Sequence, residues 1–329
     1  MDGLSISGNA VLSDLSALGN LTSIPGNLSI TQSLSLINLS GLENLISIGG
    51  YLTISGNNGL SNLTGLEDLA SISGNLGLGG NHFLSNLQGL ENLIYIGGGL
   101  SIGNNIILSD ISALSNLTSI PGSLIISANT LLVNLIGLEN INVIGEDLEI
   151  SSNFSLVSLS SFSNINSIGG ELIVNDNDGL ASLTGLDSIQ PNSITDLTIT
   201  NNASLSTCHV QSICDYLVSP NGVVEINSNA TGCNNQTEVE NACWVKIDET
   251  AAIENNIQIF PNPAKSTITI LNSSNTKINE VIIYNPSGQI ILQKNFPINT
   301  IDISKLHPGL YFVEIKTKMG HVRRKLIVE

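Results

Sequence analysis

Few residues of this 329-residue chain have the types and spacing that catalysis requires. The histidines His82, His209, His307 and His321 stand far apart, and no Ser-His-Asp, HExxH or P-loop pattern is present. A lone histidine outside such a pattern is usually a turn or surface residue. We therefore expect neither catalytic residues nor an enzymatic cofactor.

One segment, "NDNDG" at residues 175–179, is similar to part of a calcium-binding loop, with carboxylates at Asp176 and Asp178. It lacks the downstream glutamate that supplies a bidentate ligand in such loops. Calcium at these two aspartates therefore remains one hypothesis, and an ordinary turn is the other.

The cysteines are confined to one short region, at Cys208, Cys214, Cys233 and Cys243. Their spacing lacks the two CxxC-like pairs typical of a zinc site, so a disulfide-bonded cap is favoured over zinc, with free thiols as the alternative. If a last strand begins at Val224, stacking favours pairing of 208 with 233 and of 214 with 243. The segment 209–219 is expected to form a short helix that closes the core.

The elements that position these residues follow from a repeat. The quartet Leu-x-Ile-x, or a close variant, starts at Leu4, Leu28, Leu52, Leu76, Leu100, Leu124, Leu148, Leu172 and Leu197. A period of 24 residues is typical of a solenoid, and the alternation within each quartet predicts a short strand. We number the resulting coils 1 to 9 and count positions within a coil from its first leucine as zero.

The remainder of each coil is also patterned. Leu or Ile recurs at positions 8, 11, 14, 17 and 20, a three-residue spacing that predicts 3₁₀-like or extended backbone. Position 22 is glycine in most coils, with Glu146 as an exception, and we expect these glycines to turn the chain with positive φ. The pattern therefore predicts an all-β, parallel β-solenoid.

Position 5 is asparagine in every coil except coil 2, which has Ser33. Because an amide both donates and accepts, stacked asparagines can satisfy backbone groups where each coil leaves its strand. We interpret the column as a buried ladder, with an exposed ligand-binding array as the alternative. Its members are Asn9, Asn57, Asn81, Asn105, Asn129, Asn153, Asn177 and Asn202.

The coil "LTISGNNGLSNLTGLEDLASISGN", Leu52 to Asn75, resembles the leucine-rich repeat of receptor L domains, which occur in growth-factor receptors and in surface proteins of Bacteroidota. The resemblance covers about Leu4 to Cys243. It implies a right-handed parallel solenoid whose sheet often binds a protein partner, and it implies no catalysis.

Charge divides the chain. Every Lys and Arg lies from Lys246 onward, so residues 1–245 carry a charge of −20 and the remainder +3. The acidic part disfavours nucleic acid and anionic lipid as partners. No apolar run is long enough for a transmembrane helix. We expect a solenoid at 1–206, a cysteine-containing cap at 207–245, a polar linker at 246–256 and a further domain at 257–329.

The last domain has its own motifs: "FPNPA" at 260–264, "VIIYNPSGQII" at 281–291, "IDISKLHPGLYFVEI" at 301–315 and "RRKLIVE" at 323–329. Its turns predict a small β-sandwich of about seven strands. In order, these motifs resemble the type A C-terminal sorting domain of the type IX secretion system, with an immunoglobulin-like adhesive module as the alternative. The residues that carry this resemblance are Pro261, Asn262, Pro263, Gly288, Gly309, Tyr311, Arg323, Arg324 and Lys325.

The sorting-domain resemblance implies recognition by an outer-membrane translocon, and then secretion or attachment to the outer surface of a diderm bacterium. The start "MDGLSISGN" has neither a basic region nor an apolar one, so it is not an export signal. We therefore expect a further part of the protein upstream of Met1.

Together these features predict a surface binding protein for adhesion or for recognition of a protein or glycan. Outward strand positions rich in Ser and Thr raise an ice- or crystal-binding solenoid as an alternative. A non-catalytic repeat part of a larger surface enzyme is another.

A contact surface is expected on the late coils. Position −1 is acidic there, and outward isoleucines lie close by. This combination suits a cationic protein segment or a bridging divalent cation such as calcium, whereas solvated surface is the alternative. The expected residues are Ile125, Asp147, Glu149, Glu171, Ile173 and Asp196.

Overall fold

The computed structural model describes residues 3–245, 257–272, 277–286, 288–295, 300–317 and 320–329. The chain divides into two compact units, Met1–Cys243 and Trp244–Glu329. The linker expected at 246–256 lies outside the described residues. Each unit is described by itself.

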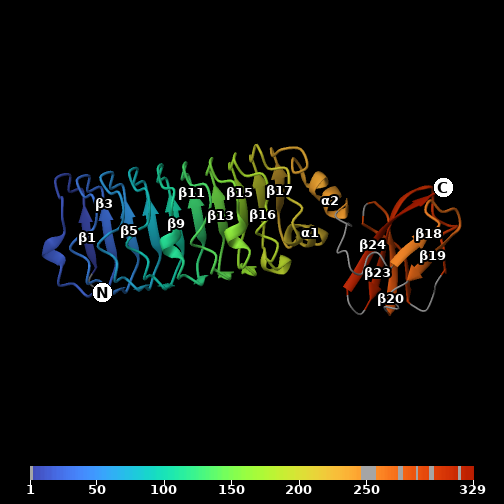
Figure 1. Ribbon diagram of the computed structural model, residues 1–329, viewed down its shortest axis with the longest axis horizontal. Coiled ribbons are helices and arrows are strands. Elements are labelled where there is room, and N and C mark those ends of the chain that lie inside the picture. Colours follow the sequence, from blue (N-terminus) through green and yellow to red (C-terminus); the bar gives the residue numbers. More distant parts are fainter. Residues whose placement is uncertain (1–2, 246–256, 273–276, 287, 296–299, 318–319) are drawn as a thin grey trace. The chain divides into compact units, whose positions relative to one another are not determined.

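The first unit is built on a ten-stranded parallel sheet, seen as a row of arrows in Figure 1. Its strands, in spatial order, are β1 (Leu4–Ser7), β3 (Leu28–Thr31), β5 (Leu52–Ser55), β7 (Leu76–Gly79), β9 (Leu100–Gly103), β11 (Leu124–Ser127), β13 (Leu148–Ser151), β15 (Leu172–Asn175), β16 (Leu197–Thr200) and β17 (Val224–Asn227). The predicted parallel β-solenoid is thus confirmed.

Strand register follows the repeat. Leu52 pairs with Leu28 and with Leu76, so equivalent residues of successive coils lie side by side. The first and third residues of each quartet point inward and the second and fourth point outward, since side chains alternate along a strand. A one-residue slip would place leucines in solvent, so the apolar pattern fixes the register.

The opposite side of each coil carries a shorter strand and, in some coils, a 3₁₀ turn. Two small parallel sheets form there, from β2 (Ser23–Ile24), β4 (Ser47–Ile48), β6 (Ser71–Ile72) and β8 (Tyr95–Ile96), and from β10 (Ser119–Ile120), β12 (Val143–Ile144) and β14 (Ser167–Ile168). The 3₁₀ turns are η1 (Ser16–Leu18), η2 (Ser112–Leu114), η3 (Ser160–Phe162) and η4 (Pro191–Ser193). The three-residue apolar spacing predicted such backbone.

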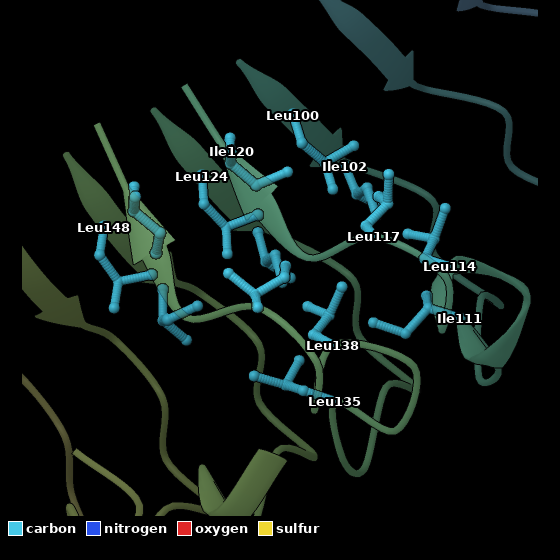
Figure 2. Close-up of a cluster of buried hydrophobic side chains, with 14 of the residues drawn as sticks. Leu100, Ile102, Ile111, Leu114, Leu117, Ile120, Leu124, Leu135, Leu138 and Leu148 are labelled. Carbon is cyan, nitrogen blue, oxygen red and sulfur yellow. The ribbon is translucent and has the colours of Figure 1, made fainter. Parts of the chain in front are cut away.

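The core fills the space inside the coils. Figure 2 shows buried side chains of coils 5 and 6, from the strands, such as Leu100 and Leu124, and from the segments that follow them, such as Leu114 and Leu138, gathered in one cluster. Leu60 donates its N–H to the Asn57 carbonyl and Leu66 donates to Leu63, so hydrogen bonds between residues three apart turn the chain at these leucines. This winding explains why leucine recurs at every third position.

The asparagines at position 5 form a buried ladder between coils. Asn105 accepts the N–H of Asn81 at 3.0 Å and donates its amide to the Leu78 carbonyl at 3.0 Å. The same pattern runs from Asn57 to Asn202 and extends to Asn229, which the sequence analysis had not included. Asn9 differs, because it is exposed and bonds to Ser7 in its own coil.

The expected role of the glycines at position 22 is wrong. None of Gly50, Gly98 and Gly170 has positive φ; instead, a Cβ at each would lie about 2 Å from a side-chain oxygen of Asn27, Asn75 or Asp147. These glycines permit close stacking of coils. Positive φ occurs at positions 4 and 13, as in Gly56 (φ 68°) and Gly65 (φ 108°).

A cap closes the end of the array that follows β16. It contains α1 (Gln211–Val218), which was predicted, and α2 (Gln236–Val245), which was not. Disulfides join Cys208 to Cys233 and Cys214 to Cys243, the pairing that coil stacking favours. The predicted disulfide-bonded cap is therefore confirmed.

The second unit has seven strands within its described ranges. One antiparallel sheet contains β18 (Ile257–Phe260), β19 (Thr267–Asn272) and β22 (Thr300–Asp302). The other contains β20 (Ile278–Tyr284), β21 (Ile290–Asn295), β23 (Gly309–Thr317) and β24 (Gly320–Val328). Buried side chains from both sheets, such as Ile268 and Val313, form one core, as a sandwich requires.

Candidate functional site

The outer face of the ten-stranded sheet carries mostly small polar residues. Ser29 lies beside Thr53 and Ser5, which would favour an ordered row of hydroxyls. The row is broken at Gly77, and again further along where Ile125 pairs with Glu149. The regular hydroxyl array that an ice-binding surface would need is therefore discontinuous.

The contact surface expected on the late coils is partly assembled. Glu149 pairs with Ile125 on one side and with Ile173 on the other, so the carboxylate lies between the two isoleucines. Glu149 accepts the Ser151 hydroxyl at 2.7 Å, and Glu171 accepts that of Thr198 at 2.7 Å. Recognition of a cation or a protein by this surface stays a prediction.

The remaining acids of that surface have a structural role. Asp147 accepts the backbone N–H of Glu171 at 2.9 Å, and Asp196 accepts that of Val223 at 2.6 Å. In earlier coils Asn75 makes the equivalent bond to Gly99 at 2.8 Å. Either an amide or a carboxylate oxygen therefore joins successive coils where the strands begin.

The calcium hypothesis concerned Asp176 and Asp178. Asp176 has positive φ (55°) and accepts the Asn175 amide at 3.0 Å, whereas exposed Asp178 accepts the Ala203 N–H at 3.4 Å. Within the described ranges, no group of three or more His, Cys, Asp or Glu is arranged to hold a metal ion. Calcium binding at these aspartates stays an untested prediction.

A hollow of about 800 Å³ lies over coils 2 to 6, on the side where the strands begin. Tyr51, Gly77 and Ser101 line it, together with Ser123 and Glu146. We call this the strand-entry hollow. It overlaps the predicted contact surface only at Ile125.

Glu146 enters the hollow because its neighbour is small. In several other coils, glycine at position 22 faces an Asn or Asp side chain that leaves no room for a Cβ, as Gly98 faces Asn75. Beside Glu146 the equivalent residue is Ser123, whose hydroxyl donates to the glutamate at 3.1 Å. The break in the glycine column, visible in the sequence, therefore marks a polar end of the hollow.

A column of exposed apolar side chains lies on coils 4 to 7 and was not predicted from the sequence. Phe83, Ile106, Leu131 and Phe154 occupy positions 6 or 7 of four successive coils, just after the ladder asparagine. All are more than two-fifths exposed, and Phe83 is 63% exposed. This column could have been recognised in the sequence, because in these four coils a large apolar residue follows the ladder asparagine by one or two positions.

In the second unit, the predicted sorting residues near the two ends of the domain lie together. The Asn262 side chain donates to the Lys325 carbonyl at 2.6 Å and accepts the Ile327 N–H at 2.8 Å. Ala264 bonds by its backbone to Ile327 and Glu329. The "FPNPA" segment, with Pro261 and Pro263 on either side of Asn262, is thus fixed to β24.

The basic residues of β24 have different surroundings. Arg324 donates to the Ile257 carbonyl at 3.1 Å, and Arg323 pairs with Glu314 at 3.4 Å. Glu314, only 5% exposed, also accepts the Tyr284 hydroxyl at 2.6 Å. Burial, reinforced by this carboxylate, raises the pKa of Tyr284 to about 12. Lys325 is exposed.

Two of the other predicted sorting residues lie on β23 close to this segment, since Gly309 pairs with Val328 and Tyr311 pairs with Leu326 of β24. The Tyr311 hydroxyl donates to the His307 carbonyl at 3.0 Å. Gly288 lies apart from them in sequence and has positive φ (77°) in the turn between β20 and β21.

Residues 258–329 match the secretion system C-terminal sorting domain. This match confirms the sorting-domain prediction, and such a domain indicates secretion or attachment at the cell surface through interaction with the secretion machinery. The matched family covers only these residues, so the resemblance of the coils to receptor L-domain repeats stays a prediction.

Two curated proteins share parts of the sequence. An endo-acting ulvan lyase of Formosa agariphila is 30% identical over 118 residues, which are 32% of this chain and 22% of that protein. A beta-agarase D of Zobellia galactanivorans is 33% identical over 73 residues, 22% of this chain and 15% of that protein. The chain thus spans about a fifth or less of these relatives.

Neither described helix of the cap is long and apolar enough to be a membrane span, and the same holds for every other helix in the described ranges.

Proposed function

We propose that this chain is a non-catalytic binding protein, exported by the type IX system and secreted or held at the outer surface of a diderm bacterium. The coil array of the first unit recognises a protein or a glycan, and residues 257–329 direct export. The observation that carries the proposal is the presence, in one chain, of a sorting-domain match and a solenoid with an open polar hollow.

The exposed apolar column on coils 4 to 7 supports the binding role. Contiguous apolar side chains on a soluble surface are typical of interaction sites. The array supplies a rigid support, since each coil is bonded to its neighbours through the sheet and the asparagine ladder. Many unrelated proteins use such stacked repeats to present a binding surface.

A deletion experiment tests the export half. In a host with a working type IX system, removal of residues 257–329 should leave a folded coil array in the periplasm, whereas the full chain reaches the surface. Removal of one interior coil, 52–75, serves as control because it leaves the sorting domain intact. Surface display of the chain that lacks 257–329, at the level of the full chain, would contradict the proposal.

Adherence tests the binding half. Cells that display the full chain should adhere to protein-coated or polysaccharide-coated surfaces more strongly than an isogenic strain without the gene. Equal adherence of the two strains to both coats would remove the binding role.

A second candidate is a non-catalytic part of a larger surface enzyme. The names of the two relatives favour it, since one is a lyase and the other an agarase, and this chain spans only a minor share of each. Sequencing of the native gene upstream of Met1 distinguishes the candidates, because a catalytic domain encoded there would favour the enzyme.

A further inference from the structure

The two outward glycines of β7, Gly77 and Gly79, have no explanation within the fold, and of these two Gly77 lines the strand-entry hollow. A Cβ on Gly77 would come no closer than 3.8 Å to Thr53 Oγ1 and 4.0 Å to the Leu52 carbonyl, which is ordinary contact. Its φ is not in the positive range that favours glycine. Glycine within a strand costs about 0.5 to 1 kcal/mol relative to alanine. Such a glycine often marks close approach of a ligand.

The missing side chain leaves the strand-entry hollow open. Its volume of about 800 Å³ is within the range of small-molecule sites. Tyr51, 43% exposed, supplies an aromatic ring, and Thr53, Ser101 and Ser123 supply hydroxyls. An aromatic surface with a few hydroxyls around it matches a sugar, which has an apolar C–H face and a polar rim.

Charge selects among sugars. Glu146 lies in the hollow, and residues 1–245 contain no Lys or Arg to pair with an anionic group. A sulfated or carboxylated glycan would meet an uncompensated negative potential there. Sugar hydroxyls, in contrast, can donate to the Glu146 carboxylate, which acts as an acceptor.

We propose that the strand-entry hollow binds a neutral oligosaccharide, with a sugar ring stacked on Tyr51 and its edge over Gly77. The proposal rests on the binding role proposed above and names its ligand class.

Glycan binding by the purified full chain tests the ligand class. The probes are soluble neutral oligosaccharides of glucose, galactose and mannose, each beside its sulfated form. At least one neutral oligosaccharide should bind, with its sulfated form roughly tenfold weaker or more. Binding of no neutral member, or equal binding of the sulfated form, overturns the proposal.

Paired variants test the location. Gly77→Thr fills the hollow with a side chain that the fold accommodates, and Gly79→Thr is its control, because Gly79 is also outward and unhindered but does not line the hollow. Tyr51→Ala removes the ring, and Tyr95→Ala removes a similarly exposed ring (52%) outside the hollow.

Gly77→Thr and Tyr51→Ala should each weaken glycan binding roughly tenfold or more, without lowering the temperature of thermal unfolding. The two control variants should bind like the wild type. Wild-type affinity in Gly77→Thr and Tyr51→Ala, or equal losses in the controls, overturns the assignment. If displaying cells adhere to protein coats but the purified chain binds no glycan, this inference alone is contradicted. If displaying cells adhere to neither coat more strongly than the strain without the gene, the proposed function is contradicted as well.

Discussion

At the scale of single residues, much of the acidity of the coil array is structural. Glu43, Glu67 and Glu91 each accept the backbone N–H of a glycine two residues earlier, at 2.8 to 2.9 Å. Asp147 and Asp196 accept N–H groups where strands begin. A carboxylate that satisfies a backbone donor explains an acid without reference to any ligand. The negative charge of the array is thus in part a product of its turns.

In the sorting domain, Tyr284 predicts a loss of stability at alkaline pH. Its folded-state pKa is raised to about 12, above the ordinary value of about 10. A raised pKa contributes stability that is present below about pH 10 and is lost as pH rises through about 12. Alkaline unfolding of the full chain, followed with tyrosinate absorbance, should show this loss, and Tyr284→Phe should flatten it. An unchanged alkaline slope in the variant would contradict the assignment.

At the scale of elements, the asparagine ladder joins each coil to the next. Asn105→Leu leaves the Asn81 N–H and the Leu78 carbonyl without their partner inside the array. The free energy of unfolding should fall by about 1 to 3 kcal/mol. Ser101→Ala, at an outward position of the neighbouring strand, should change it by less than about 0.5 kcal/mol. Denaturant titration measures both, and equal losses would show that the ladder has no special role.

The sequence predicted the regular elements well, because apolar spacing alone determines which residues lie inside a coil. It did not predict why the glycines of position 22 are needed, since their neighbours belong to the adjacent coil and only stacking brings Asn75 against Gly98. The helix α2 was missed because half of its residues are polar and its apolar residues are not concentrated on one face. Tyr51 and Glu146 were also missed as candidate ligand contacts, because they belong to different coils. Both line the hollow beside Gly77, which forms only when the coils stack.

At the scale of the whole molecule, stability is distributed along the array and not concentrated in one centre. Each coil contacts mainly its neighbours, so the ends are the places where unfolding begins. The cap protects one end through α1, α2 and two disulfides. Its stability should therefore be separable from that of the interior coils.

Removal of one disulfide tests this separation. The bond between Cys214 and Cys243 closes a loop of 29 residues, so Cys214→Ser with Cys243→Ser should destabilise the cap by about 3.5 kcal/mol. Amide hydrogen exchange should accelerate in α2 and remain unchanged in β5 to β11. Equal acceleration across the whole array would mean that it unfolds as a single cooperative unit.

The constant register of the first seven coils also has a genetic consequence. Each of these coils is 24 residues long and presents the same faces to its neighbours, so one coil corresponds to a fixed, in-frame length of coding DNA. Unequal recombination between two such segments adds or removes a whole coil and leaves every leucine opposite a leucine. Each event moves the hollow relative to the cap by one strand spacing, about 4.8 Å. The distance between the strand-entry hollow and the cap is therefore a heritable trait that changes in steps of one coil.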